Sequence, residues 1–296
     1  MTSTELTPSS IDMKIENGEL SMFKLKRKIG RGAFGIVYKA QVKQSGRIVA
    51  LKQMKISSLE DKDMLEQAKK ECRIHYALSH SNILTLLGFF HDKKYIYLIC
   101  EFADNGDLRN LISKMHSGKL EEAIAARFLR QLACALHYCH SKSVIHRDIK
   151  QENLLLDKHL NLKLCDFGLS VATDVKRTTQ VGTPIYLAPE LVAGEPYDHA
   201  VDAWATGVLL FEMLVGRSPF KSFEEIENVS YQIPPEVNHG PTNLISALLK
   251  KQPQHRLLMI HVIEHMWMEM MHKVEDVEWN KFYKSLSKSK KSYERR

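Results

Sequence analysis

The chain has 296 residues, of which 44% are hydrophobic and 26% are charged, as in an ordinary globular protein. This length can bury a substantial core but is too short for several large domains. The first 20 or so residues are polar and lack the apolar core of a signal peptide. The apolar stretch 201–216 contains Asp202 and Glu212, so we expect a buried helix there and not a membrane span.

Charge and cysteine content limit the expected binding partners and the expected cellular compartment. The net charge is +7, but residues 281–296 hold seven Lys or Arg and one Glu, so the rest is almost neutral. An interaction with nucleic acid or membrane therefore rests on this tail alone, and a solvated end is the favoured interpretation. None of the cysteines forms a Cys-x-x-Cys pair, which argues against zinc and redox motifs and fits a reducing cytosol or nucleus.

The first part of the chain has the pattern of strands. A polar leader, 1–22, precedes it. Alternating apolar residues and runs of β-branched and aromatic residues predict strands. They are expected from Phe23 through Ile29 and over 36–42, 48–54 and 95–100. Apolar residues at helical spacing predict one helix in this part, over about 60–78.

Helical patterns dominate after Gly106. The predicted helices cover about 120–140, 202–214, 242–250 and 261–271. We therefore expect an α+β protein in which a small, sheet-bearing lobe precedes a larger helical lobe, with ligands bound between them. The expected boundaries are 23–100 for the small lobe, 101–106 for a hinge, 107–271 for the large lobe and 272–296 for a basic tail.

Residues 30–37 read Gly-x-Gly-x-x-Gly-x-Val. Glycines allow a chain to approach phosphate groups closely, because no Cβ intrudes. A dinucleotide-binding loop has the same glycines but leads into a helix. Here a strand is expected over 36–42, which favours a strand–turn–strand nucleotide loop; a glycine-rich hairpin without a ligand is the alternative. The candidate binding residues are Gly30, Arg31, Gly32, Ala33, Phe34, Gly35, Ile36 and Val37.

The next strand carries Val49-Ala50-Leu51-Lys52. The ammonium of Lys52 lies among apolar neighbours and needs an anion. Phosphate oxygens of a nucleotide could provide it. The carboxylate of Glu71 could do so too, because Ile74 and Leu78 place Glu71 on the inward side of its helix. Taken singly, Lys52 and Glu71 could each be a surface residue.

The segment 146–153 reads His-Arg-Asp-Ile-Lys-Gln-Glu-Asn and resembles the catalytic loop of protein kinases. The resemblance implies that Asp148 orients the substrate hydroxyl and accepts its proton. It implies that Lys150 stabilises the moving phosphoryl group and that Asn153 ligates Mg²⁺. A lysine at this position resembles serine/threonine kinases. Asp166-Phe167-Gly168 follows, and Asp166 would bridge Mg²⁺ to the phosphates.

Further protein-kinase motifs come next, Gly182-Thr183-Pro184, Ala188-Pro189-Glu190 and Asp202-x-Trp204-x-x-Gly207. By the resemblance, Thr183 hydrogen-bonds Asp148 and Lys150, and Glu190 is buried against Arg256. The resemblance covers about 23–268 and implies a two-lobed fold whose small lobe has a five-stranded antiparallel sheet. The lysine, the catalytic Asp and both metal ligands are present, which argues against a pseudokinase scaffold.

The same resemblance predicts an ATP site with Mg²⁺. The adenine would lie between Val37 and Ala50 on one side and Leu155 on the other. The backbone of Glu101 and Ala103 would hydrogen-bond its edge.

Several stretches resemble the Aurora family more specifically. They include Glu71-Cys72-Arg73-Ile74, Gly88-Phe89-Phe90-His91-Asp92, Arg177-Thr178-Thr179 and Leu214-Val215-Gly216-Arg217. Differences from that family are Cys100, Gln151, Leu169, Ala188 and a shortened stretch between Phe220 and Asn243. The polo family or another cell-cycle kinase is the alternative.

An Aurora-like kinase implies a role in mitosis and an activating partner peptide on the small lobe. Its location would be cytoplasmic and nuclear, at centrosome, spindle or chromosomes during mitosis. Membrane and nucleic-acid partners are not expected.

By the resemblance, the stretch between Asp166-Phe167-Gly168 and Ala188-Pro189-Glu190 is the activation segment, and it indicates regulation and substrate choice. Thr179 is the best candidate phosphosite and Thr178 the second; Arg147 would pair with the phosphate. Lys176 and Arg177 precede Thr179, so self-phosphorylation would indicate a preference for basic residues before the target. Two acids are candidates to bind those residues, Glu152 and Asp107; both could also be solvated loop acids.

Overall fold

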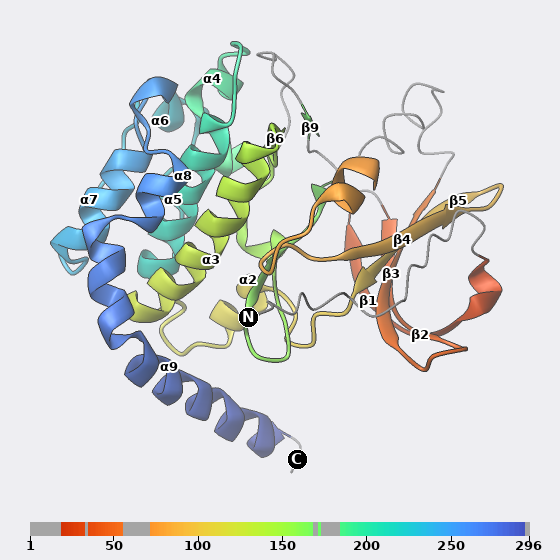
Figure 1. The fold of residues 1–296 in the computed structure, drawn as a ribbon. Helices are drawn as coiled ribbons and strands as arrows, with labels where there is room; N and C mark the ends of the chain where they lie inside the picture. The colour runs from red at the N-terminus through yellow and green to blue at the C-terminus, as the bar shows by residue number, and fades with distance from the viewer. Residues whose placement is uncertain (1–18, 33–34, 56–71, 168–170, 173–183, 294–296) are drawn as a thin grey trace, which may run out of the picture. The chain divides into compact units, whose positions relative to one another are not determined.

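The computed structural model describes residues 19–32, 35–55, 72–167, 171–172 and 184–293 (Figure 1). The chain forms two compact units. The first comprises Met1–Cys72 and Thr85–Phe102, and the second comprises Arg73–Leu84 and Ala103–Arg296. Each unit has its own hydrophobic core.

The first unit is built on a five-stranded antiparallel sheet with the strand order β1-β2-β3-β5-β4. A single 3₁₀ turn, Leu20–Met22, precedes it. The strands are β1 Phe23–Gly32, β2 Gly35–Val42, β3 Ile48–Lys55, β4 Leu86–His91 and β5 Tyr95–Glu101. Val49, Leu51 and Ile99 are completely buried in its core. The predicted sheet is confirmed.

Two details of this sheet differ from a simple period-2 pattern. Phe23 is buried, but Leu25 and Ile29 each expose 41% of their surface. Register shifts interrupt the pairing of β1 with β2 at Leu25/Arg27 and at Lys28/Gly30. A bulge changes the face to which only the following side chains point, so these shifts bear on Ile29 but do not account for the exposure of Leu25, which precedes both.

The second unit is mostly helical. Its helices are α2 Leu108–Ser113, α3 Glu122–Ser141, α4 Pro189–Val192, α5 Ala200–Val215, α6 Phe223–Glu227, α7 His239–Leu248, α8 Met259–Ile263 and α9 Met266–Tyr293. α3 packs against α5, α8 and α9 (Figure 1). One predicted helix, 261–271, was wrong as a single element, because the chain breaks at Glu264 and His265 between α8 and α9.

α5 is the buried helix expected from the apolar stretch 201–216. Every residue from Ala200 to Leu214 is buried, including Asp202 and Glu212. Across the described ranges, no helix combines the length and apolarity needed to span a membrane. All five cysteines are present as thiols, as expected.

Two small sheets frame the loop 146–153 within the second unit. β6 (Val144–Ile145) pairs with β9 (Val171–Ala172) just before the loop. β7 (Leu154–Leu156) pairs with β8 (Leu162–Leu164) just after it. The loop ends in a 3₁₀ turn, Gln151–Asn153. Both of its ends are therefore fixed by strand pairing.

Candidate active site

Asp202 of α5 holds the start of the loop 146–153 in place. Its carboxylate accepts hydrogen bonds from the backbone N–H groups of His146, at 3.0 Å, and Arg147, at 2.9 Å. It also contacts Nε2 of His140 at 2.8 Å. Burial opposes ionisation of this carboxyl, but its contacts with His140 and His146 hold the pKa of Asp202 below its ordinary value. An ionised side chain in the core thus fixes the backbone entering the loop.

Two residues of the predicted site, Arg147 and Asp166, have an unusual backbone conformation. Arg147 has φ of 69° and Asp166 has φ of 63°, both in the left-handed region. Non-glycine residues adopt this region at an energetic cost, and such residues cluster at functional sites. Arg147 exposes only 8% of its surface and donates from Nη1 to the hydroxyl of Tyr197 at 2.7 Å. It is not a solvated surface charge.

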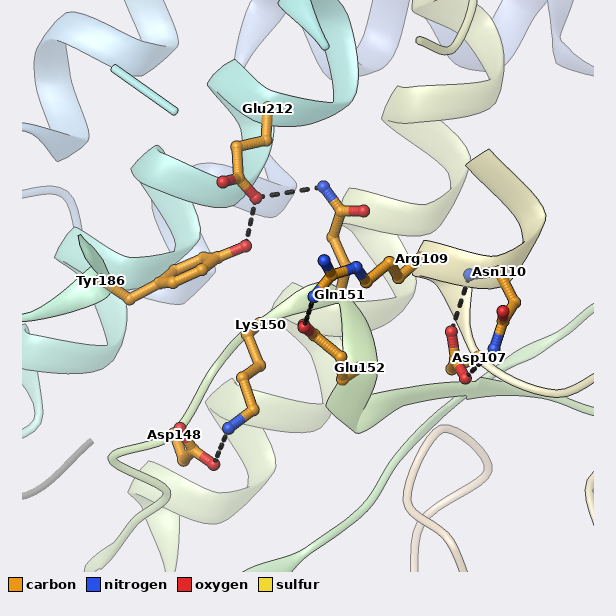
Figure 2. A network of polar contacts seen from close by, with 9 residues as sticks. All are labelled: Asp107, Arg109, Asn110, Asp148, Lys150, Gln151, Glu152, Tyr186 and Glu212. Carbon is orange, nitrogen blue, oxygen red and sulfur yellow. Dashed lines mark hydrogen bonds and ion pairs between the residues drawn. The ribbon is translucent and has the colours of Figure 1, made fainter. Parts of the chain in front are cut away.

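The carboxylate of Asp148 lies at the centre of the loop. Lys150 Nζ donates to its Oδ2 at 2.6 Å (Figure 2). The amide nitrogen of Asn153 donates both to Oδ2, at 2.8 Å, and to the backbone carbonyl of Asp148, at 2.7 Å. Asp148 is 8% exposed. The carboxylate is therefore fixed in orientation, next to a cation, as a group that aligns a hydroxyl must be.

His146 connects this loop to the segment 165–167. Its Nδ1 accepts the backbone N–H of Asp148 at 3.3 Å, and its Nε2 lies 3.0 Å from the carbonyl of Cys165. One neutral tautomer satisfies both contacts, with the proton on Nε2. Burial lowers the pKa of His146, although Asp202 opposes this, so the neutral form is favoured. The ring also packs edge-on against Phe167, with centroids 4.9 Å apart.

Asn153 and Asp166 were predicted to hold Mg²⁺. The backbone N–H of Cys165 donates to the carbonyl of Asn153 at 2.9 Å, which links the two segments. Because the amide nitrogen of Asn153 is bonded to Asp148, the oxygen end of the amide is the one that can face a cation. A carboxylate and an amide oxygen are the hard ligands that Mg²⁺ prefers, so the donor set fits this ion.

A second polar network lies beside the loop (Figure 2). Gln151 donates from Nε2 to Glu212 at 3.0 Å, and the hydroxyl of Tyr186 donates to the same carboxylate oxygen. Burial raises the pKa of Glu212, against the effect of these two hydrogen bonds. Next to them, Arg109 forms an ion pair with Glu152. The sequence interpretation included Glu152 but missed Glu212, which looked like part of an apolar helix.

Asp107, the other acid predicted to bind substrate, has a local partner. It is the N-cap of α2 and accepts the backbone N–H of Asn110 at 2.7 Å. The side-chain amide of Asn110 also donates to it. An aspartate at the start of a helix satisfies amide groups that otherwise lack partners, which gives Asp107 a structural role.

Three of the predicted nucleotide-binding residues of the first unit, Val37, Ala50 and Lys52, share one face of its sheet. Val37 lies directly opposite Lys52 in the pairing of β2 with β3, and Ala50 is two residues from Lys52. Directly opposed residues, and residues two apart along a strand, point to the same side. Cys100 opposes Ala50 on β5 and joins this face.

Gly35 and Gly30 differ in their surroundings. A Cβ on Gly35 would lie 2.0 Å from the carbonyl oxygen of Gln53, and φ of Gly35 is 151°. A Cβ on Gly30 would meet only Val37, at 3.8 Å. The fold therefore requires glycine at 35, whereas at 30 it leaves room for another residue.

The predicted residues divide between the two units. Gly30, Val37, Ala50, Lys52 and Glu101 belong to the first unit. The second contains Ala103, Asp107, Asp148, Lys150, Glu152, Asn153, Leu155 and Asp166. Several predicted residues lie outside the described part of the chain: Ala33, Phe34, Glu71, Thr178, Thr179 and Thr183.

Comparison with known proteins agrees with this geometry. Residues 23–268 match the family model described as protein kinase domain. An Aurora kinase of Patiria pectinifera is 42% identical over 275 residues, which cover 90% of this chain and 68% of the relative. Aurora kinase B-A of Xenopus laevis is 44% identical, with 83% of this chain and 70% of the relative covered. Aurora kinase C of Mus musculus is 42% identical, with 83% and 91% covered. The region matched to this chain covers 62% of the length of Aurora kinase A-A of Xenopus laevis.

Proposed function

Because the chain belongs to the Aurora family of serine/threonine protein kinases, we propose that it phosphorylates proteins of the dividing cell at serine or threonine preceded by basic residues. The observation that carries the catalytic part is that Lys150 and Asn153 both donate hydrogen bonds to the buried carboxylate of Asp148. This arrangement is suited to phosphoryl transfer, in which the protein mainly positions groups and stabilises charge.

Three residues of the loop have defined tasks in this proposal. Asp148 orients the substrate hydroxyl and takes up its proton as the bond to phosphorus forms. Lys150 places a positive charge where the phosphoryl group moves. Asn153 holds Asp148 through its amide nitrogen and offers its oxygen, together with Asp166, to Mg²⁺. Bound ATP supplies the γ-phosphoryl group: its bond to the β-phosphate breaks as the new bond to the substrate oxygen forms, and ADP leaves.

The proposed nucleotide contacts follow from the resemblance of the motifs to those of protein kinases. We assign the phosphates to the backbone of 30–37 and to Lys52, which pairs with Glu71 when the enzyme is active. The adenine lies against Val37, Ala50 and Leu155 and bonds to the backbone of Glu101 and Ala103. The common face of Val37, Ala50 and Lys52 supports this assignment.

Regulation is proposed on the activation segment. Phosphorylation of Thr179, or secondarily Thr178, adds charge that pairs with Arg147 and orders the segment around Thr183. The place of Arg147 beside Asp148 supports this link between loop order and catalysis. We also propose that a partner peptide binds the small lobe and activates the enzyme. The proposed sites of action are cytoplasm and nucleus, with centrosome, spindle or chromosomes in mitosis.

The proposed domain covers 23–271, with a leader, 1–22, and a basic tail, 272–296. α9 continues past residue 271, and Trp279 packs edge-on against Phe128 of α3 with centroids 5.8 Å apart. The ion pair of Glu275 with Arg127 adds to this contact. These contacts favour including the first part of the tail in the folded domain.

A degenerate peptide library tests the proposal. The full chain, ATP and Mg²⁺ are incubated with peptides in which each position around a central Ser or Thr is varied. We expect phosphorylation of Ser and Thr with a preference for Arg or Lys at −2 or −3. Acidic or proline-directed selection would contradict the basic preference and weaken the proposed role in division. Absence of transfer to any peptide would instead favour the scaffold alternative.

A further inference from the structure

Arg109 lies against the carboxylate that is proposed to bind a substrate arginine. It is in the first turn of α2, and its guanidinium pairs with Glu152 of the catalytic loop (Figure 2). The side chains are 69% and 40% exposed, respectively. The chain thus provides its own arginine at the position where a substrate would have to place one.

A second carboxylate contributes to the charge at this place. Glu212 is 9% exposed, and its contacts with Gln151 and Tyr186 are hydrogen bonds from neutral groups. Burial raises the pKa of Glu212, Glu152 adds to the rise and Arg109 opposes it, so the three charges interact. Arg109 contacts Glu152, whereas Glu212 is held by Gln151 and Tyr186, so ionisation of both carboxylates leaves one negative charge more than Arg109 can neutralise.

We infer that Arg109 is a specificity residue that competes with substrate arginine for this acidic site, formed by Glu152 and Glu212. The inference rests on the proposed preference for basic substrates. With Arg109 in place, only substrates whose arginine can displace it gain from the site. Substrates without such an arginine neither displace Arg109 nor depend on it.

The energetics of the pair favour displacement. An exposed ion pair is worth about 0.2–1 kcal/mol, because solvent screens it and ordering two long side chains opposes it. An incoming arginine can use the same planar fork on the same carboxylate. Removal of Arg109 should therefore improve binding of an arginine-containing peptide by about 1.4-fold to fivefold, the factor that corresponds to this range.

The test compares two peptides that differ only in Arg or Ala at −2, phosphorylated by the full chain. We expect Arg109→Ala to lower KM for the Arg peptide by about 1.4-fold to fivefold, with kcat and the KM of the Ala peptide unchanged. Lys114→Ala is the matched control, because Lys114 is an exposed cation at the other end of the same helix. This control should leave both KM values unchanged.

Two further comparisons separate competition from a structural effect. In a Glu152→Gln background, Arg109→Ala should no longer lower KM, because its counter-charge is gone. The gain should also shrink at high salt, where exposed charges are screened. Arg109→Gln, which keeps much of the side-chain length, should reproduce Arg109→Ala if the charge is responsible.

The outcomes distinguish this inference from the proposed function. A wild-type enzyme that prefers the Arg peptide, with a KM that rises or stays constant in both Arg109 variants, would overturn the inference alone. A wild-type enzyme that treats the two peptides alike would reject the proposed basic preference, and the inference with it. An equal gain from Lys114→Ala would show a general charge effect and would also overturn it.

Discussion

Arg256 and Glu190 form a buried ion pair with two parallel hydrogen bonds. Nη1 and Nη2 of Arg256 lie 2.6 and 2.7 Å from the two carboxylate oxygens, and the side chains are 0% and 4% exposed. Arg256 also donates to the backbone carbonyls of Ala200, Lys250 and Lys251. This pair was predicted from the resemblance to kinases and is confirmed. It connects α4 to the chain just before α8.

Breaking this pair should destabilise the protein strongly. Arg256→Met leaves the carboxylate of Glu190 buried without its counter-ion, which costs about 3–5 kcal/mol. Urea unfolding followed by circular dichroism measures the change. Arg73→Met, at an exposed position, is the control and should change the free energy by less than about 0.5 kcal/mol. A loss below about 1 kcal/mol for Arg256→Met would mean that the pair does not hold this region together.

The two glycines of the β1–β2 hairpin should respond differently to alanine. Gly35→Ala puts a Cβ 2.0 Å from the carbonyl oxygen of Gln53 and strains φ, so the melting temperature should fall by several degrees. Gly30→Ala meets only ordinary contacts, so its melting temperature should stay close to that of the wild type. Its KM for ATP should rise, because a Cβ intrudes on the phosphates. Equal melting temperatures for the two variants would show that the hairpin adapts to a side chain at 35.

The buried carboxyl of Glu212 gives a prediction about pH. Its pKa in the folded protein is raised by burial above the ordinary value of 4.5. The folded state then binds the proton more tightly than the unfolded state, so this group's contribution to stability falls as pH rises from about 4.5 through the folded pKa. Glu212→Gln, which cannot ionise, should therefore gain stability relative to the wild type over this range. Unfolding free energies measured from pH 4.5 upward test this; a constant difference would contradict it.

The regular elements of the chain could be predicted from local pattern because long apolar periods mark them. The helix expected over 120–140 is α3, Glu122–Ser141, and the strand expected over 95–100 is β5, Tyr95–Glu101. β4 was not predicted as a strand. Its sequence, Leu-Leu-Gly-Phe-Phe-His, contains a glycine and no alternation, and a register shift occurs between Leu86 and Gly88. β4 is a strand because it pairs with β5, and its own sequence does not indicate this pairing.

The candidate site, too, could be predicted only in part from the local sequence. Motif spacing identified Asp148, Lys150 and Asn153, which the structure brings together. Glu212 has no local signal, since only the packing of α5 brings it to Gln151, a residue 61 positions earlier in the chain. Asp107 had the charge of a substrate-binding acid, but a capping role depends on where a helix begins. Contacts between distant segments are decided by the fold and not by the local sequence.

The measurement that tests the central claim most directly is phosphate transfer by Asp148→Asn. Asparagine keeps the shape of the side chain and can still accept a bond from Lys150, but it cannot take up the proton of the substrate hydroxyl. Transfer from labelled ATP to a serine peptide should fall by about 10²–10⁴-fold in kcat, with the melting temperature and the KM for ATP close to those of the wild type. An Asp148→Asn enzyme that transfers phosphate at the wild-type rate would contradict the assignment of this loop as the catalytic centre.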